Sequence, residues 1–102
     1  MDDCVRIAYA WLDAQAKIRR PLDRSRPLKH YVEAWAGRYV SQQDVEAAAE
    51  LHPDVRGVYP RFNLSANLTE PNYRRLAGIA EAGKHPNYRM HGYRKIYARA
   101  EA

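Results

Sequence analysis

The stretch VSQQDVEAAAELHPDVRGVYPRFNLSANL, residues 40–68, decides the fold that this sequence predicts. It begins with Ser41 and Asp44, which are spaced like the two partners of a helix capping box. Apolar residues from Val45 to Leu51 recur at helical spacing, and Pro53 ends the pattern. The sequence therefore predicts a helix that begins near Ser41 and ends before Pro53.

The second half of the stretch carries turn residues followed by polar side chains. Pro53, Gly57 and Pro60 indicate a turn, and we expect a short fourth helix over residues 60–66. Two helices joined in this way resemble a helix-turn-helix unit, in which polar side chains of the second helix read DNA bases. The polar side chains in those positions are Arg61, Asn63, Ser65 and Asn67. The alternative interpretation is that the apolar side chains of this segment fill the core.

Helical spacing is also present on the amino-terminal side of this stretch. A first helix is predicted over residues 2–17, and Pro21 lies beyond its end. A second helix is predicted over residues 27–39, with a proline in its first turn. Trp11 and Trp35 lie on the apolar faces of these helices. We therefore expect both tryptophans in the core.

On the carboxyl-terminal side, Thr69 is a candidate N-cap for a fifth helix that ends before Gly83. Rough alternation of apolar and polar residues around Gly92 favours an extended arm or a small β-hairpin. The predicted fold class is mainly α, a small bundle of four to five short helices resembling a helix-turn-helix protein. Residues 1–83 would form the helical domain, and residues 84–102 a basic, tyrosine-rich arm or wing.

Charge is segregated along this chain of 102 residues, which has a formal net charge of +5. Residues 17–29 hold six Lys and Arg against one acid, and residues 84–100 hold five against none. The rest of the chain is acidic on balance. Basic segments of this kind favour a nucleic acid, an anionic membrane or an acidic protein surface as partner. The alternative is that these cations only solubilise loops.

Two sets of side chains are therefore candidate contacts for nucleic acid or an anionic partner. The cations in the two basic segments would contact phosphates, and tyrosines among them would stack on bases or enter a groove. The candidate cations are Lys17, Arg19, Arg20, Arg24, Arg26, Lys29, Arg89, Arg94, Lys95 and Arg99, in addition to the four polar residues at positions 61–67. The candidate aromatic contacts are Tyr88, Tyr93 and Tyr97.

Catalytic and metal-binding motifs are not found in the sequence. The four histidines and the single Cys4 lack metal-ligand spacing, and no phosphate-binding loop or nucleophile motif is present. We expect no enzymatic activity, no catalytic residues and no cofactor. One cysteine without an apolar leader or membrane span predicts a cytoplasmic protein.

The sequence thus predicts a small non-enzymatic binding protein. The favoured function is nucleic-acid binding as a helix-turn-helix-like regulator, with DNA favoured over RNA. The alternative is a protein–protein interaction module, such as a small phage-type inhibitor or accessory protein that binds an acidic surface of a larger partner. Tyrosine and arginine are enriched in both kinds of interface. Membrane binding ranks lower, because the basic residues lie in loops and not along one face of a helix.

Overall fold

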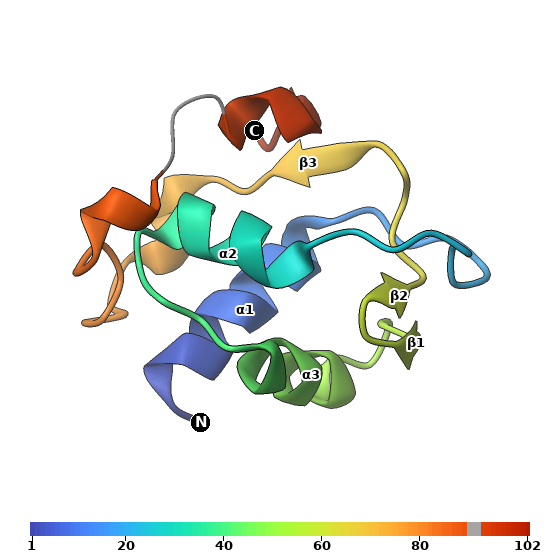
Figure 1. Ribbon diagram of the computed structural model, residues 1–102, viewed down its shortest axis with the longest axis horizontal. Coiled ribbons are helices and arrows are strands. Elements are labelled where there is room, and N and C mark those ends of the chain that lie inside the picture. Colours follow the sequence, from blue (N-terminus) through green and yellow to red (C-terminus); the bar gives the residue numbers. More distant parts are fainter. Residues whose placement is uncertain (90–92) are drawn as a thin grey trace.

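The computed structural model describes residues 1–89 and 93–102, and of Tyr93 and Arg94 it describes the backbone only (Figure 1). The helices of this part are α1 (Asp3–Ala14), α2 (Leu28–Ala36) and α3 (Gln42–Leu51). Its strands are β1 (Gly57–Val58), β2 (Arg61–Phe62), β3 (Leu68–Glu70) and β4 (Tyr97–Ala100). Its short 3-10 helices are η1 (Tyr73–Leu76), η2 (Pro86–Tyr88) and η3 (Tyr93–Ile96).

Helix α1 lies between α2 and α3 and supplies the centre of the core (Figure 1). It begins where the Asp2 carboxylate accepts a hydrogen bond from the Val5 amide at 2.9 Å. It ends at Ala14, earlier than predicted, because the Lys17 ammonium binds two carbonyl oxygens of its last turn at 2.8 and 2.9 Å. The prediction of a first helix is confirmed with a shorter end.

Helices α2 and α3 are also confirmed, although α2 ends at Ala36 and not at the predicted residue 39. Gly37 ends α2 in the left-handed conformation, with φ of +63°. The capping box of α3 is complete, because Ser41 and Asp44 each bond the backbone of the other. Trp11 and Trp35 are both fully buried, as expected.

The predicted fourth helix over residues 60–66 is wrong. Strand β1 pairs antiparallel with β2, so the chain forms a two-stranded hairpin around the Tyr59–Pro60 turn. The amide side chain of Asn63 stabilises this hairpin. Its oxygen accepts a hydrogen bond from the Arg56 backbone N–H at 2.6 Å. Helix α3 is therefore followed by a hairpin, and the helix-turn-helix prediction is wrong as well.

The predicted fifth helix after Thr69 is wrong too. Residues 68–70 form β3, which pairs in parallel with β4, and within the range predicted as a helix, which ends before Gly83, only the short 3-10 helix η1 forms. Gly78 takes a φ of +80°, a conformation that interrupts a right-handed helix. Because β3 and β4 are far apart in the sequence, local patterns could not predict their pairing.

The described part of the carboxyl-terminal segment is neither a free arm nor a hairpin, because β4 pairs in parallel with β3. The alternation predicted around Gly92 falls partly on residues 90–92, outside the described residues. The fold is therefore mixed α and β, with two small sheets in its described part, and the prediction of a bundle of four to five helices is wrong. The domain boundary after residue 83 stays a prediction.

None of the helices in residues 1–89 and 93–102 combines the length and the apolar composition that crossing a bilayer requires.

The hairpin can be tested with Gly57→Ala. A Cβ at Gly57, where φ is +107°, would clash with the backbone carbonyl oxygen of Arg61. Gly78→Ala is the matched control, because its φ is also positive but a Cβ there would meet nothing within 4 Å. We expect Gly78→Ala to lower the free energy of unfolding by about 1–2 kcal/mol, and Gly57→Ala to lower it clearly more. Urea unfolding measures both, and equal losses would contradict the hairpin geometry.

Candidate nucleic-acid interface

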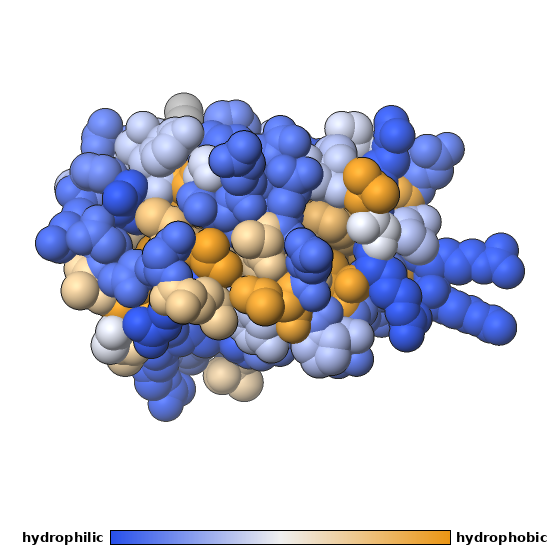
Figure 2. Space-filling model, turned by 90° about the horizontal axis from the view of Figure 1, so that it is seen from below, coloured by the Kyte–Doolittle hydropathy of each residue, from blue (hydrophilic) through white to orange (hydrophobic). Residues whose placement is uncertain are grey.

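Five arginines with exposed side chains gather at one end of the molecule, which we call the arginine end. Three lie in the loop of residues 16–27 between α1 and α2, and two lie in the hairpin segment. They are Arg19, Arg20, Arg24, Arg56 and Arg61. Figure 2 shows long hydrophilic side chains that extend from the end where this loop lies in Figure 1.

Backbone hydrogen bonds hold the loop beside the hairpin segment. The Ile18 amide donates to the Asn63 carbonyl at 2.8 Å, and the Leu22 amide donates to the Phe62 carbonyl at 3.3 Å. The Ser65 amide donates in turn to the carbonyl of Ala16 at 2.8 Å. The loop thus runs along β2 and its continuation as an additional extended segment. This pairing brings together arginines that lie more than 30 residues apart in the sequence.

The two segments that form the arginine end hold few acids themselves, and Glu46 and Glu50 of α3 line a hollow beside the hairpin. The loop holds one acid, Asp23, and the segment of residues 52–64 holds one, Asp54. The carboxylate of Asp23 is fully exposed and lies 3.9 Å from the Arg61 guanidinium. An exposed pair at that distance is weak, so it leaves most of the positive charge available to an anionic partner.

Three cations predicted as partner contacts instead stabilise the fold. Lys17 closes α1, as described above, and the Lys29 ammonium pairs with the buried Glu33 carboxylate at 2.6 Å. Arg26 is only 7% exposed and donates to the Ser65 carbonyl at 3.2 Å. These contacts fix the two ends of the basic loop, whereas its central arginines remain exposed.

The four predicted base-reading residues do not lie together on a helix. Asn63 is only 1% exposed, and its side-chain amide bonds backbone groups of Ile18, Asp54 and Arg56. The Ser65 hydroxyl accepts a hydrogen bond from the Asn67 amide at 3.1 Å within its own turn. Arg61 and the Asn67 side chain are exposed. The structure therefore gives Asn63 a structural role and leaves Arg61 and Asn67 accessible.

Residues 84–89 of the second basic segment do not join the arginine end in one patch. The amides of Gly83 and His85 donate to the carbonyls of Ala36 and Gly37, at 2.8 and 2.7 Å, which places residues 84–89 at the carboxyl-terminal end of α2. The basic loop lies at the opposite end of this helix (Figure 1).

The remaining predicted contacts of this segment differ in their surroundings. The Arg89 guanidinium lies over the Tyr73 ring at 5.3 Å, and the Tyr97 hydroxyl accepts a hydrogen bond from Trp11 at 2.8 Å. Lys95 and Arg99 are exposed, and Tyr88 is half-buried. The side chains of Tyr93 and Arg94 lie outside the described residues.

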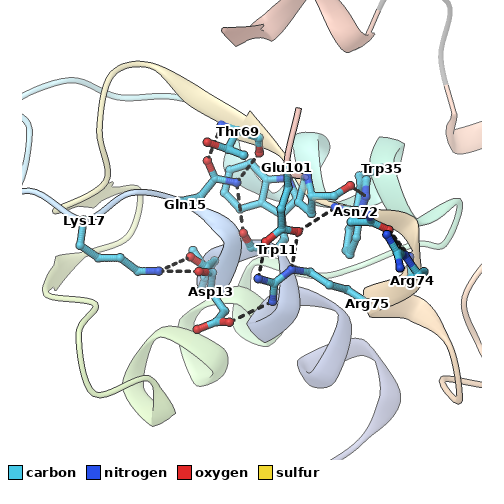
Figure 3. A network of polar contacts seen from close by, with 12 residues as sticks. Trp11, Asp13, Gln15, Lys17, Trp35, Thr69, Asn72, Arg74, Arg75 and Glu101 are labelled. Atoms are coloured by element: carbon cyan, nitrogen blue, oxygen red, sulfur yellow. Dashed lines mark hydrogen bonds and ion pairs between the residues drawn. The ribbon is translucent and has the colours of Figure 1, made fainter. Parts of the chain in front are cut away.

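A second cluster of ionisable groups joins Asp13 of α1, Arg75 of η1 and Glu101 near the carboxyl terminus (Figure 3), and His52, which follows α3, also belongs to it. Arg75 binds both carboxylate oxygens of Glu101, at 2.7 and 2.6 Å, and reaches Asp13 at 2.9 Å. Nε2 of His52 bonds the other carboxylate oxygen of Asp13 at 2.8 Å, and Nδ1 of His52 accepts a hydrogen bond from the Asp54 amide at 3.1 Å. Both imidazole nitrogens thus bond groups of the protein itself. Because Arg75 ties Glu101 to Asp13 of α1, we call this cluster the latch of the carboxyl terminus.

Sequence reasoning missed Arg56 and the latch. Arg56 lies within the turn predicted between two helices, and its proximity to the basic loop depends on a hairpin that the sequence does not predict. The latch joins residues from four separate parts of the chain, and no local spacing marks it. Searches with this chain match no protein-family model, no curated protein and no solved structure. The residues themselves therefore carry the functional inference.

The latch makes the stability of the protein depend on pH. A hydrogen bond from His52, supported by Arg75, lowers the pKa of the Asp13 carboxyl, and Arg75 likewise lowers the pKa of Glu101. A carboxyl whose pKa is lower in the folded state stabilises the protein fully above its unfolded pKa, which is about 4. That stabilisation is lost as the pH falls through the lower, folded value.

We expect Glu101→Gln to be less stable than the wild type at pH 7, and this difference to shrink as the pH is lowered from about 5 to about 2.5. Urea unfolding across this pH range measures it. Glu50→Gln, which removes an exposed carboxylate on α3, is the control and should leave a small difference at every pH. A Glu101→Gln difference that stays constant down to pH 2.5 would contradict the latch.

Proposed function

We propose that the protein binds the phosphate backbone of nucleic acid through the arginine end. The observation that carries this proposal is the convergence of five exposed guanidinium groups, from two separate segments, on a frame fixed by hydrogen bonds. Guanidinium groups match phosphate oxygens in geometry and remain charged at all physiological pH values. Two aspartates oppose them within the same segments, so these segments carry a net positive charge.

Recognition of this kind is largely independent of base sequence. Phosphate contacts position a protein on nucleic acid but carry no sequence information by themselves. The exposed arginines lie on a loop and a short hairpin, where they form no ridge that would fill a major groove in the way a recognition helix does. Affinity would therefore come mainly from counterion release and fall steeply with salt.

The proposal is tested with a salt series on labelled single-stranded DNA, duplex DNA and RNA. The variant Arg19→Ala/Arg20→Ala/Arg24→Ala should bind at least tenfold more weakly than the wild type at about 0.1 M salt. Its plot of log affinity against log salt should be shallower by about 2 for single strands, because three phosphate contacts are lost.

The matched control is Arg6→Ala/Arg74→Ala/Arg99→Ala, which removes the same charge from exposed positions outside the arginine end. It should weaken binding only slightly. Equal weakening by the two variants would show that diffuse net charge is responsible and would contradict the arginine end. Absence of binding to all three ligands at about 0.1 M salt would overturn the proposal in favour of an acidic protein surface.

A further inference from the structure

Three aromatic rings form a cluster on the surface near the carboxyl-terminal end of α2. The Tyr39 and Tyr88 ring centroids are 6.1 Å apart, and the His85 ring lies 6.0 Å from Tyr88. Tyr39 is 45% exposed, the His85 side chain is exposed and Tyr88 is half-buried. We call these three residues the aromatic cluster. It stands apart from the core and makes an aromatic surface accessible to a partner.

The backbone holds the aromatic cluster in place. Gly37 turns the chain after α2, and its carbonyl oxygen accepts a hydrogen bond from the His85 amide at 2.7 Å. The Tyr39 amide lies 3.4 Å from Nδ1 of His85, which accepts this longer hydrogen bond. Tyr39 and His85 are therefore fixed relative to each other, although 46 residues separate them in the sequence.

Cations surround the cluster. The Lys29 ammonium lies 5.0 Å from the centre of the Tyr39 ring, and Glu33 accepts a hydrogen bond from this ammonium at 2.6 Å. Glu81 is paired with Arg38 at 2.9 Å and with Lys84 at 3.3 Å, and Asp44 also interacts with Arg38. Glu33 and Glu81 are thus each neutralised by a cation of the protein.

Lys29 also connects the aromatic cluster to the arginine end. Its backbone amide donates a hydrogen bond to the hydroxyl of Tyr59, in the hairpin turn, at 3.2 Å. Its side chain reaches in the other direction, to Tyr39. One lysine therefore spans the distance between the hairpin that carries Arg61 and the exposed rings. The basic loop precedes α2 and the aromatic cluster lies beyond its carboxyl-terminal end, and 9 helical residues span about 14 Å, so a strand bound at the arginine end would run along α2 to reach the aromatic cluster.

We propose that the protein selects single-stranded nucleic acid, with phosphates at the arginine end and bases stacked on Tyr39 and Tyr88. This inference rests on the proposed function and specifies its substrate. Proteins that bind single strands combine a positive track for the backbone with aromatic side chains on which bases stack. In a duplex the faces of the bases are covered by their neighbours, so the aromatic cluster would contribute nothing to duplex affinity.

The test compares three ligands of equal length: a single strand, the same strand with abasic sites throughout, and a duplex. We expect Tyr39→Leu/Tyr88→Leu to bind the normal single strand about 5- to 100-fold more weakly than the wild type. It should bind the abasic strand and the duplex as the wild type does. Tyr39→Phe/Tyr88→Phe keeps both rings and should retain wild-type affinity, and circular dichroism and thermal unfolding check the fold of each variant.

The outcomes separate this inference from the proposed function. Wild-type protein that binds the normal and the abasic strand equally well would overturn base stacking, and this measurement needs no variant. Binding to all three ligands that is weakened by loss of Arg19, Arg20 and Arg24 but not by loss of the two rings would leave the proposed function standing and refute the inference. Failure of every ligand to bind would refute both.

Discussion

The side-chain amide of Asn63 joins the three segments on which the arginine end depends. Its oxygen accepts from the Arg56 amide at 2.6 Å, and its nitrogen donates to the carbonyls of Ile18 and Asp54 at 3.1 and 3.0 Å. A buried amide without these partners would cost about 1–3 kcal/mol, so the three segments are held in the one arrangement that satisfies it. The basic loop, the end of α3 and the hairpin are thereby fixed to one another.

A second buried amide has the same function at the other sheet. The Gln15 side chain accepts a hydrogen bond from the Thr69 amide and donates to the Thr69 carbonyl, each at 2.8 Å. It also donates to the carbonyl of Trp11 at 3.1 Å, which ties β3 to the end of α1. Strands of two to four residues form few ladder hydrogen bonds, so these side chains supply the order that longer strands would provide.

The α-helices could be predicted from the sequence because their signals lie close together along the chain. The sheets could not, because strand pairing joins residues that are far apart in the sequence. Periodicity and caps such as Ser41 and Asp44 are local, so they located α3 to within a residue or two. The β3–β4 pairing joins residues that local spacing cannot connect. Asn63 was misassigned for a related reason. Its backbone partners lie in other segments, so the sequence could not show that its side-chain amide is buried. Arg19, Arg20, Arg24 and Arg61 were identified as candidate contacts, but the sequence could not show that Arg56 joins them.

The basic loop resolves into two kinds of cation according to position. Lys17 at its start and Arg26 near its end bind carbonyl oxygens of the fold, and the arginines between them remain exposed. Fixed ends, together with backbone bonds to β2, restrict the loop before any partner arrives. Binding then orders fewer backbone dihedrals and requires less entropy to be lost than binding by a flexible basic tail. The cations of this one loop therefore have two roles. Those at its ends stabilise the fold, and those at its centre are available to a partner.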